Sequence, residues 1–270
     1  MTVTRRQAEE LLARHGVRPS RALGQNFVVD PNTVRRVVRL AGIEPGDRVV
    51  EVGAGLGSLT LALAEVGAEV TAVELDRHLL PVLDEVLAHA EPRPTVVQAD
   101  ALELDWPSLL AGAEQWHLVA NLPYNVATPL VLDLLDRVPA IDRMLVMVQR
   151  EVGERLAASP GTKAYGIPSV KVAYWAEADV VGRVGPNVFW PKPRVESALV
   201  RIARRSEPAT GADPDALFTL VRAGFGQRRK MLRGSLSGLV DPSAFERAGV
   251  SAQSRAEELS IEDWGRLVDA

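Results

Sequence analysis

Short apolar runs alternate with amphipathic segments through the middle of the chain, and this pattern predicts an α/β sheet. The runs are four to six residues long and rich in valine and other apolar residues, as buried strands are. They lie at residues 48–52, 69–74, 95–98, 116–120 and 143–148. Segments with helical spacing of their apolar residues lie at residues 59–65, 78–89 and 129–138. Strands that alternate with helices in this way form a parallel sheet with helices on both faces.

The flanking parts of the chain extend this domain at both ends. Residues 1–40 indicate two helical pieces around an irregular stretch, and the second piece begins at Pro31, since proline favours the first turn of a helix. Residues 176–184 and 197–203 alternate like strands and are expected to complete the sheet. We therefore predict a large α/β domain over residues 1–205.

A small helical domain is predicted behind a linker. Residues 206–214 contain two prolines, a glycine and several small residues, which is typical of a linker. The helical segments that follow are residues 214–226, 228–239 and 256–268. We assign residues 206–270 to this second, all-α domain.

Composition excludes several classes of protein. The 270 residues are 47% hydrophobic, enough for a substantial core, and 24% charged. The absence of cysteine rules out a disulfide framework, thiolate zinc ligands and a cysteine nucleophile. No apolar run reaches the roughly 18 residues that a membrane span needs, and the charged N-terminus lacks a signal-peptide core. We expect a cytoplasmic protein without a membrane partner.

The net charge of −4 conceals two basic blocks on an acidic body. Residues 1–39 carry eight arginines against three acids, and residues 201–238 carry eight basic residues against three acids. Residues 40–200, by contrast, carry 12 basic and 22 acidic residues. Ordinary scatter of surface charge is one interpretation. The other is a footprint for a polyanion such as nucleic acid.

A glycine-rich turn follows the first strand of the central pattern. Gly53, Gly55 and Gly57 come directly after residues 48–52, and glycine lets the backbone turn tightly and approach a ligand. A dinucleotide fingerprint requires glycine at the sixth position, where this chain has Ser58, so an NAD-dependent oxidoreductase is disfavoured. No Lys-Ser/Thr pair follows, which excludes a phosphate-binding P-loop. A purely structural turn is the alternative.

Acidic residues stand near the ends of three successive strands. Glu51 precedes the glycine turn, Glu74 ends the second strand, and Asp100 follows the third. Ligands of open α/β sheets bind beyond the carboxyl ends of the strands, where an acid can accept hydrogen bonds from ribose hydroxyls or from an adenine amine. A cofactor with ribose and adenine but no pyrophosphate fits this set, and S-adenosylmethionine is one. Solvated acids at strand ends are the alternative.

Five further motifs resemble those of one known family. They are Gly24–Phe27, Asn121–Tyr124 (Asn-Leu-Pro-Tyr), Val188–Ala198, Phe225–Arg233 and Arg255–Ser260. In this order they resemble the ribosomal RNA adenine N6-dimethyltransferases, specifically the small-subunit (16S) branch. The resemblance implies a Rossmann-like S-adenosylmethionine-dependent methyltransferase domain with helices on both faces of its sheet, followed by a small all-α domain.

The resemblance also implies which residues form the site. The cofactor-binding residues would be Asn26, Val28, Gly53, Gly55, Glu74, Asp100, Ala101 and Asn121. The catalytic residues would be Asn121, Leu122, Tyr124 and Phe189. Position 28 departs from the family's usual leucine, which a contact through the backbone tolerates. For the aromatic residues, packing in the core is the alternative.

The chemistry of adenine N6 explains the Asn-Leu-Pro-Tyr motif. The N6 lone pair is delocalised into the ring, so acceptors for the amine hydrogens favour the geometry in which that lone pair attacks. The Asn121 side-chain oxygen and the Leu122 carbonyl are the expected acceptors, and Tyr124 and Phe189 are expected to stack on the base. Direct attack on the sulfonium methyl yields S-adenosyl-L-homocysteine and requires no metal, so we predict no metal site.

The basic blocks then become candidate RNA-binding surfaces. Arg228, Arg229, Lys230 and Arg233 lie within six residues, and a helix would place Arg229 and Arg233 on one face. Such charges bind phosphates, while the pocket selects the base. The expected partner is 16S rRNA within the immature 30S subunit, and a monomer is expected. A solvated helix face is the alternative interpretation of these cations.

Two other functions remain open at this point. A 23S rRNA adenine N6-methyltransferase of the antibiotic-resistance type would use the same chemistry, although the C-terminal motifs favour the small-subunit branch. A non-catalytic small-subunit assembly factor would also carry the basic blocks. The intact Asn121–Tyr124 motif favours the enzyme, and a role in small-subunit biogenesis is compatible with both.

Overall fold

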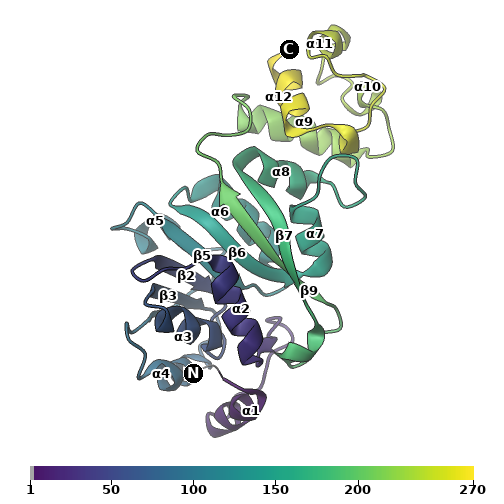
Figure 1. The fold of residues 1–270 in the computed structure, drawn as a ribbon. Helices are drawn as coiled ribbons and strands as arrows, with labels where there is room; N and C mark the ends of the chain where they lie inside the picture. The colour runs from purple at the N-terminus through teal and green to yellow at the C-terminus, as the bar shows by residue number, and fades with distance from the viewer. Residues whose placement is uncertain (1–2) are drawn as a thin grey trace. The chain divides into compact units, whose positions relative to one another are not determined.

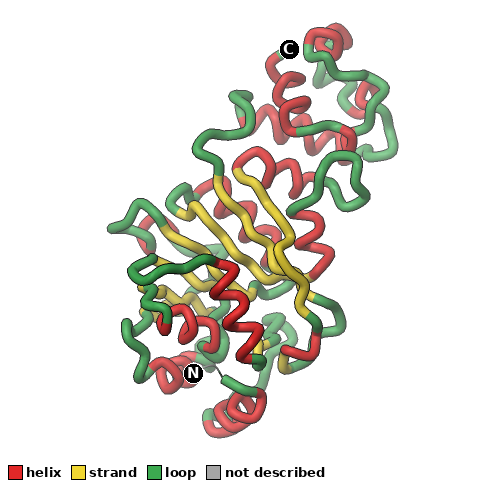
Figure 2. The backbone as a smooth tube through the Cα atoms, viewed as in Figure 1, coloured by secondary structure: helices red, strands yellow, loops and turns green. Residues whose placement is uncertain are grey.

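A seven-stranded mixed sheet forms the centre of the computed structural model, which describes residues 3–270 (Figures 1 and 2). Its strand order is β4-β3-β2-β5-β6-β9-β7. The strands are β2 (Arg48–Val52), β3 (Glu69–Glu74), β4 (Thr95–Gln98), β5 (Trp116–Asn121), β6 (Ile141–Gln149), β7 (Ala176–Val184) and β9 (Ser197–Arg204). The first five are parallel to their neighbours, and β9 runs antiparallel to β6. The predicted α/β class is confirmed.

Helices cover both faces of this sheet, as the alternating pattern predicted. The helices of this part of the chain are α1 (Arg5–Arg14), α2 (Pro31–Ala41), α3 (Ser58–Glu65), α4 (Leu80–Leu87), α5 (Trp106–Leu109), α6 (Ala127–Arg137) and α7 (Arg150–Leu156). Of these, α1 packs with α4 and not with the sheet. In Figure 1, α2 and α3 lie in front of the sheet and α6 lies behind it. Val34, Val37 and Val38 of α2 are buried against sheet residues such as Val119 and Leu145.

The start and end of α2 show how local sequence sets an element. The Asp30 side chain accepts a 2.9 Å hydrogen bond from the Thr33 backbone N–H, which caps the helix, and Pro31 occupies its first turn. Gly42 ends the helix in the left-handed region at φ 64°. A second, two-stranded sheet pairs β1 (Phe27–Val28) with β8 (Phe189–Trp190), which directly follows the short helix η1 (Pro186–Val188) in the chain. This pairing brings the N-terminal segment to the loop after β7.

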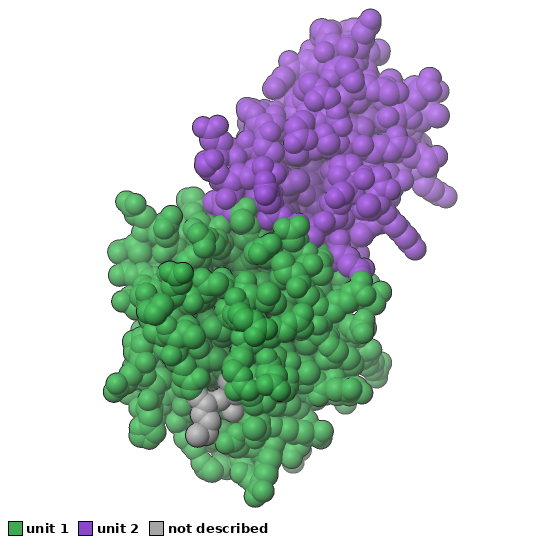
Figure 3. All heavy atoms as spheres, in the orientation of Figure 1, with its two compact units in different colours: residues 1–153, 179–203 green, residues 154–178, 204–270 purple. Residues whose placement is uncertain are grey.

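The chain divides into two compact units, coloured separately in Figure 3. The first comprises residues 1–153 and 179–203, and the second comprises residues 154–178 and 204–270. The sequence placed residues 154–178 in the first domain. They join the second unit because Tyr165, Val170 and Tyr174 are buried in one core with Leu217 and Trp264. The remaining helices are α8 (Ile167–Trp175), α9 (Pro214–Gly226), α10 (Leu232–Ser235), α11 (Pro242–Arg247), η2 (Ala256–Glu258) and α12 (Ile261–Asp269).

The predicted helix over residues 228–239 is wrong. Residues 227–230 form a turn, closed by a 2.7 Å hydrogen bond from the Lys230 N–H to the Gln227 carbonyl, and α10 is only four residues long. The backbone N–H groups of Leu232 and Arg233 donate to the Ser254 and Ala252 carbonyls, at 2.8 and 3.0 Å. Because these donors bond to a distant loop, Arg229 and Arg233 do not share one helical face.

Candidate active site

One pocket at the carboxyl ends of β2, β3 and β5 collects most of the predicted site residues. They are Asn26, Gly53, Gly55, Glu74, Asp100, Ala101, Asn121, Leu122 and Tyr124. These positions are scattered over about a hundred residues of sequence. They meet because parallel strands end at the same edge of a sheet.

The glycine turn after β2 is built so that only glycine fits. Gly53 and Gly55 have φ values of 77° and 59°, in the left-handed region that other residues rarely adopt. A Cβ at Gly55 would stand 2.9 Å from Cδ1 of Phe27, and one at Gly53 would stand 3.4 Å from Cδ of Pro123. The N-terminal segment and the Asn-Leu-Pro-Tyr turn thus approach this backbone closely. Glycine at these two positions is therefore explained by the packing of the turn as well as by its place in the pocket lining.

Glu74 and Asp100 line the pocket, each in part engaged by nearby backbone. The Glu74 oxygens accept hydrogen bonds from the backbone N–H groups of Gly55 and Asp76, at 2.8 and 2.9 Å. Burial nevertheless raises the pKa of Glu74, since its side chain is almost fully enclosed. One Asp100 oxygen accepts from the Leu102 N–H at 2.9 Å, and the other oxygen is left to accept from a ligand.

Glu51, the acid before the glycine turn, has a different position. It is 2% exposed and does not line the pocket. The Thr60 hydroxyl in α3 donates to it at 2.5 Å, and burial raises its pKa to about 8. Glu51 is therefore a protonated structural carboxyl behind the glycine turn at neutral pH, and the acids that line the pocket are Glu74 and Asp100.

The Asn121 side chain is held in one orientation. Its Nδ2 donates a 3.0 Å hydrogen bond to the Asn26 carbonyl. Since an amide has its donor at one end and its acceptor at the other, this bond leaves Oδ1 as the free acceptor in the pocket. The adjacent Leu122 N–H donates to the Met147 carbonyl at 3.0 Å, which secures the turn to β6.

Tyr124 is positioned by a residue that sequence reasoning missed. Its hydroxyl lies 3.0 Å from the Ser197 Oγ, and Ser197 is fully buried at the start of β9. Burial raises the pKa of Tyr124, so the phenol is neutral and available for this hydrogen bond. No pattern in the sequence links positions 124 and 197, which are 73 residues apart.

A second missed contact ties the N-terminal segment across the pocket. Gln25 Nε2 donates to Asp76 Oδ2 at 2.8 Å, and Gln25 Oε1 accepts from the Ser20 N–H at 2.6 Å. Gln25 lines the pocket next to Asn26. Together with the bond from Asn121 to Asn26, this contact makes residues 23–27 one wall of the site.

Two predicted site residues, Val28 and Phe189, lie outside the pocket lining. They are paired with each other between β1 and β8 and pack in the core cluster that includes α2 and α3. Phe189 is 3% exposed, so core packing describes its position. The aromatic residues that do line the pocket are Phe27 and Tyr124.

A groove beside the pocket shares part of its wall and carries positive charge. Gly24, Gln25, Asn26, Tyr124 and Asn125 line both hollows. The groove adds Arg21, Lys192 and Arg194, which are exposed and form no ion pair with any residue between 3 and 270. The nearby acid, Glu196, is already paired with Arg150 at 2.9 Å. An anionic strand could therefore lie in this groove beside the pocket.

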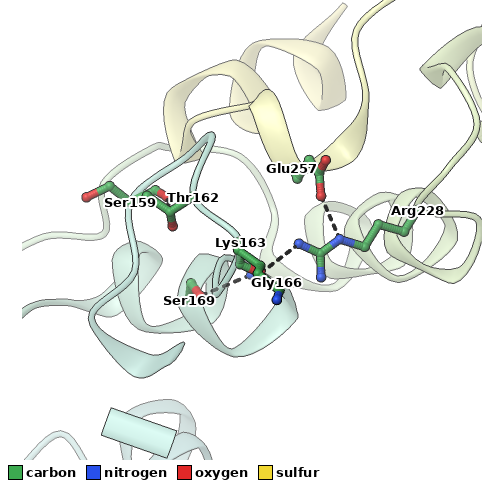
Figure 4. A network of polar contacts seen from close by, with 7 residues as sticks. All are labelled: Ser159, Thr162, Lys163, Gly166, Ser169, Arg228 and Glu257. Carbon is green, nitrogen blue, oxygen red and sulfur yellow. Dashed lines mark hydrogen bonds and ion pairs between the residues drawn. The ribbon is translucent and has the colours of Figure 1, made fainter. Parts of the chain in front are cut away.

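The four C-terminal cations differ in their surroundings. Arg229, Lys230 and Arg233 are exposed, and their side chains form no hydrogen bond or ion pair within the described part of the chain. Arg228 is engaged: it pairs with Glu257 at 2.6 Å and donates to the Lys163 carbonyl at 3.0 Å (Figure 4).

Neither a metal cluster nor a membrane span is found between residues 3 and 270. No three His, Asp or Glu side chains in this range are grouped so that they could hold a metal ion. No helix in the same range is long and apolar enough to cross a bilayer.

The sheet, the glycine turn, the acids of β3 and β4 and the Asn-Leu-Pro-Tyr turn define a Rossmann-like, S-adenosylmethionine-dependent methyltransferase. The model of the family "Ribosomal RNA adenine dimethylase" matches residues 17–270. The chain therefore belongs to the ribosomal RNA adenine dimethylase family, which confirms the resemblance.

Curated relatives and solved structures agree with this assignment. "Ribosomal RNA small subunit methyltransferase A" of Streptomyces coelicolor is 50% identical, over 96% of this chain and 93% of that protein. The protein of the same name from Thermobifida fusca is 48% identical, over 99% and 95%. The 23S rRNA methyltransferase ErmE is 27% identical with a TM-score of 0.69, over 90% of this chain and 98% of that one. A Plasmodium falciparum dimethyladenosine transferase shares the fold at 21% identity and TM-score 0.74, over 88% and 94%.

Proposed function

We propose that this protein transfers methyl groups from S-adenosylmethionine to N6 of two adjacent adenosines near the 3′ end of 16S rRNA, in the immature 30S subunit. The observation that carries the proposal is the fixed orientation of Asn121, whose Nδ2 donates to the Asn26 carbonyl and whose Oδ1 is left to accept from an adenine amine. The relatives named as small-subunit methyltransferases support the choice of substrate. The reaction then belongs to the cytoplasm, with the protein acting as a monomer in small-subunit biogenesis.

The pocket fits an adenosine cofactor that lacks a pyrophosphate. Gly53 and Gly55 adopt backbone conformations in which a side chain would be strained, and their backbone lines the pocket beside Phe27 and Pro123. Glu74 and Asp100 present carboxylate oxygens for the ribose hydroxyls and the adenine amine, and Ala101 and Asn26 line the same pocket. Val28 supports the Asn26 wall from β1, behind the lining. When bound, S-adenosylmethionine supplies the electrophilic methyl group, and S-adenosyl-L-homocysteine is the product.

The protein's own groups prepare the nucleophile. Asn121 Oδ1 and the Leu122 carbonyl accept the two N6 hydrogens and thereby direct the nitrogen lone pair out of the plane of the base. Asn121 is held by the bond from its Nδ2 to the Asn26 carbonyl, and Leu122 by the bond from its N–H to the Met147 carbonyl, so little reorganisation is needed. Catalysis then consists mostly of orientation, with no covalent enzyme intermediate.

The target base stacks on Tyr124 after it leaves its own strand. Stacking of a base on an aromatic ring is worth roughly 1–3 kcal/mol, which offsets part of the unstacking. Ser197 holds the Tyr124 hydroxyl, and buried Phe189 supports this region through the β1–β8 pair. The C-terminal RNA-binding region comprises Arg228, Arg229, Lys230 and Arg233, and phosphates are the ligands of the last three, whose side chains form no hydrogen bond or ion pair within residues 3–270.

Methyl transfer from labelled S-adenosylmethionine tests the proposal. The substrates are 30S subunits that lack the modification, with 50S subunits and protein-free 16S rRNA alongside, and the products are identified as nucleosides. Dimethyladenosine on the 30S subunit alone is expected. Label on the 50S subunit would instead indicate a 23S rRNA methyltransferase, like the structural relative ErmE. Tight 30S binding without any label would indicate an assembly factor.

A further inference from the structure

The loop between α7 and α8 is held against the C-terminal part of the second unit by a compact polar network (Figure 4). The Gly161 N–H donates to the Glu257 carbonyl at 2.7 Å, and an Arg228 terminal nitrogen donates to the Lys163 carbonyl at 3.0 Å. Arg228 Nε also donates to the Glu257 carboxylate at 2.6 Å. The loop is thus clamped by two bonds, one to the Glu257 backbone carbonyl and one from Arg228, and the Glu257 carboxylate acts on the loop by holding Arg228 in place.

The loop is anchored at its far end as well. Tyr165, 1% exposed, donates its hydroxyl proton to the Leu259 carbonyl at 2.9 Å. The Gly166 N–H donates to Ser169 Oγ, and that hydroxyl donates to the Arg155 carbonyl. Between the clamp and this anchor, the exposed Lys163 side chain forms no hydrogen bond or ion pair with the described residues. Its ammonium group is free to meet an anion.

Arg228 differs from its neighbours because two of its three guanidinium nitrogens are already bound within the protein. An arginine that neutralises a carboxylate and holds a backbone carbonyl has less to offer a phosphate than Arg229 or Lys230, which are free within residues 3–270. Yet the same two bonds hold Lys163 close to residues 228–233, which we call the basic segment.

We infer that Arg228 and Glu257 are positioning residues, which fix residues 157–166 so that Lys163 joins Arg229 and Lys230 in binding rRNA phosphates. The inference rests on the proposed function, because it assumes that this basic segment binds RNA. It assigns Lys163 a contact and Arg228 an indirect role. It also gives an acidic residue, Glu257, a favourable effect on the binding of a polyanion.

The direction in which Glu257→Ala changes RNA affinity separates this inference from simple electrostatics. Removing a negative charge near phosphates should strengthen RNA binding through the field alone. If Glu257 holds the loop, Glu257→Ala should instead weaken binding to unmodified 30S subunits several-fold and lower the salt slope by about one, as the loss of one phosphate contact does. Glu207→Ala is the matched control, since Glu207 is an exposed acid of the same unit without a described partner.

A double-mutant cycle makes the connection to Lys163 specific. Lys163→Ala should weaken binding as Glu257→Ala does, and the double variant should bind no more weakly than Lys163→Ala alone. Glu257→Gln keeps an oxygen that can accept from Arg228, so its affinity should lie between those of the wild type and Glu257→Ala. Thermal unfolding of each variant checks that it is folded.

Limited trypsin digestion gives a readout that needs no RNA. Trypsin cuts at the Lys163 carbonyl, the same group that Arg228 holds, so Glu257→Ala and Arg228→Ala should accelerate cleavage after Lys163 severalfold. Arg229→Ala should leave that rate unchanged. Unchanged cleavage in both clamp variants would overturn the inference.

The binding results distinguish two failures. If Arg229→Ala weakens 30S binding while Glu257→Ala equals the wild type or binds more tightly, the positioning role is refuted and the RNA-binding proposal stands. If Arg229→Ala and Lys230→Ala both bind as the wild type does, the RNA-binding role of the segment fails, and the inference fails with it.

Discussion

The hydrogen bond from Asn121 to Asn26 predicts that a change in Asn121, the proposed acceptor for the adenine amine, also weakens the binding of S-adenosylmethionine. Nδ2 of Asn121 lies 3.0 Å from the Asn26 carbonyl, and residues 23–27 form one wall of the cofactor pocket. In Asn121→Asp a carboxylate oxygen replaces this donor and faces the carbonyl oxygen. The wall then loses a hydrogen bond and gains a repulsive contact.

The size of the effect follows from the partly buried position of this bond. A carbonyl left without its donor costs about 1–3 kcal/mol. At about 1.4 kcal/mol per factor of ten, the affinity for S-adenosylmethionine should fall roughly fivefold at the lower value and roughly 150-fold at the upper. The affinity for S-adenosylmethionine falls by this full amount only if the cofactor requires residues 23–27 to be in place before it binds.

Isothermal titration of S-adenosylmethionine into the free protein, without RNA, measures this loss. Asn121→Ala removes the donor without adding a charge, so it should weaken binding less than Asn121→Asp does. Asn187→Asp makes the same chemical change at an exposed position of η1 and should leave the affinity unchanged. Wild-type affinity in Asn121→Asp would refute the conclusion that this bond holds the wall.

Three further outcomes follow from the same site. In Gly55→Ala, a Cβ 2.9 Å from Phe27 at a φ of 59° should distort the turn and lower cofactor affinity at least tenfold in titration, since left-handed backbone alone costs about 1–2 kcal/mol. Burial raises the Glu51 pKa from 4.5 to about 8, so wild-type stability should fall as pH rises between these values, by at most about 1.4 kcal/mol per unit, and Glu51→Gln should flatten the dependence of Tm on pH. Binding to 30S subunits should weaken linearly on a log–log plot against salt, and a flat line would contradict phosphate binding.

The contribution of Glu51 to the pH dependence of folding stability is opposite in sign to that of most carboxylates. A pKa raised in the folded state means that the folded protein holds a proton which the unfolded chain has released between pH 4.5 and 8. Stability is therefore greatest below pH 4.5 as far as this group is concerned, and its contribution is lost as pH rises to about 8. Equal pH dependence in the wild type and Glu51→Gln would show that Glu51 is charged in the folded protein.

The central sheet was predictable because strand burial leaves a strong pattern. Residues 48–52, 69–74 and 95–98 were expected as strands and form β2, β3 and β4 at those bounds. Each is a short apolar run closed by glycine or a polar residue, and little else in the chain competes with that pattern. The antiparallel place of β9 beside β6 was not predicted, since alternation alone does not state a partner.

The helices of the second unit were less predictable because tertiary contacts decide their ends. Residues 228–239 have a helical spacing of apolar residues, yet Leu232 and Arg233 bond to the loop at residues 252–254. α7 and α8 were missed, and α8 joins the second unit through the long-range packing of Tyr174 against Phe218, with ring centroids 5.5 Å apart. Local propensity is a weak guide where such contacts are available.

The candidate site was predicted better by residue type than by spacing. Glycine at left-handed positions has few alternatives, and Gly53 and Gly55 line the pocket. Of the three acids near strand ends, Glu74 and Asp100 line the pocket, whereas Glu51 is buried behind it. The position of Phe189 was harder to predict, because an aromatic ring is equally suited to a base-binding pocket and to a hydrophobic core. Ser197 and Gln25 lie within two of the quoted motifs, but the motifs do not state their partners, which are 73 and 51 positions away.

The strand order explains why the proposed cofactor-binding residues and the proposed base-binding residues meet at one edge of the sheet. The chain places β3 on one side of β2 and β5 on the other, so the connections leave the sheet in opposite directions at this point and open a crevice at its carboxyl edge. Glu74 reaches the pocket from the β3 side, and Asn121 and Tyr124 reach it from the β5 side, so the proposed cofactor site and the proposed base site adjoin. The wall at residues 24–26 borders both the pocket and the basic groove. In the proposed reaction, a base that enters from the groove reaches Asn121 beside the methyl donor. A strand order that did not place β3 and β5 on either side of β2 would separate the two sites even if every side chain were kept.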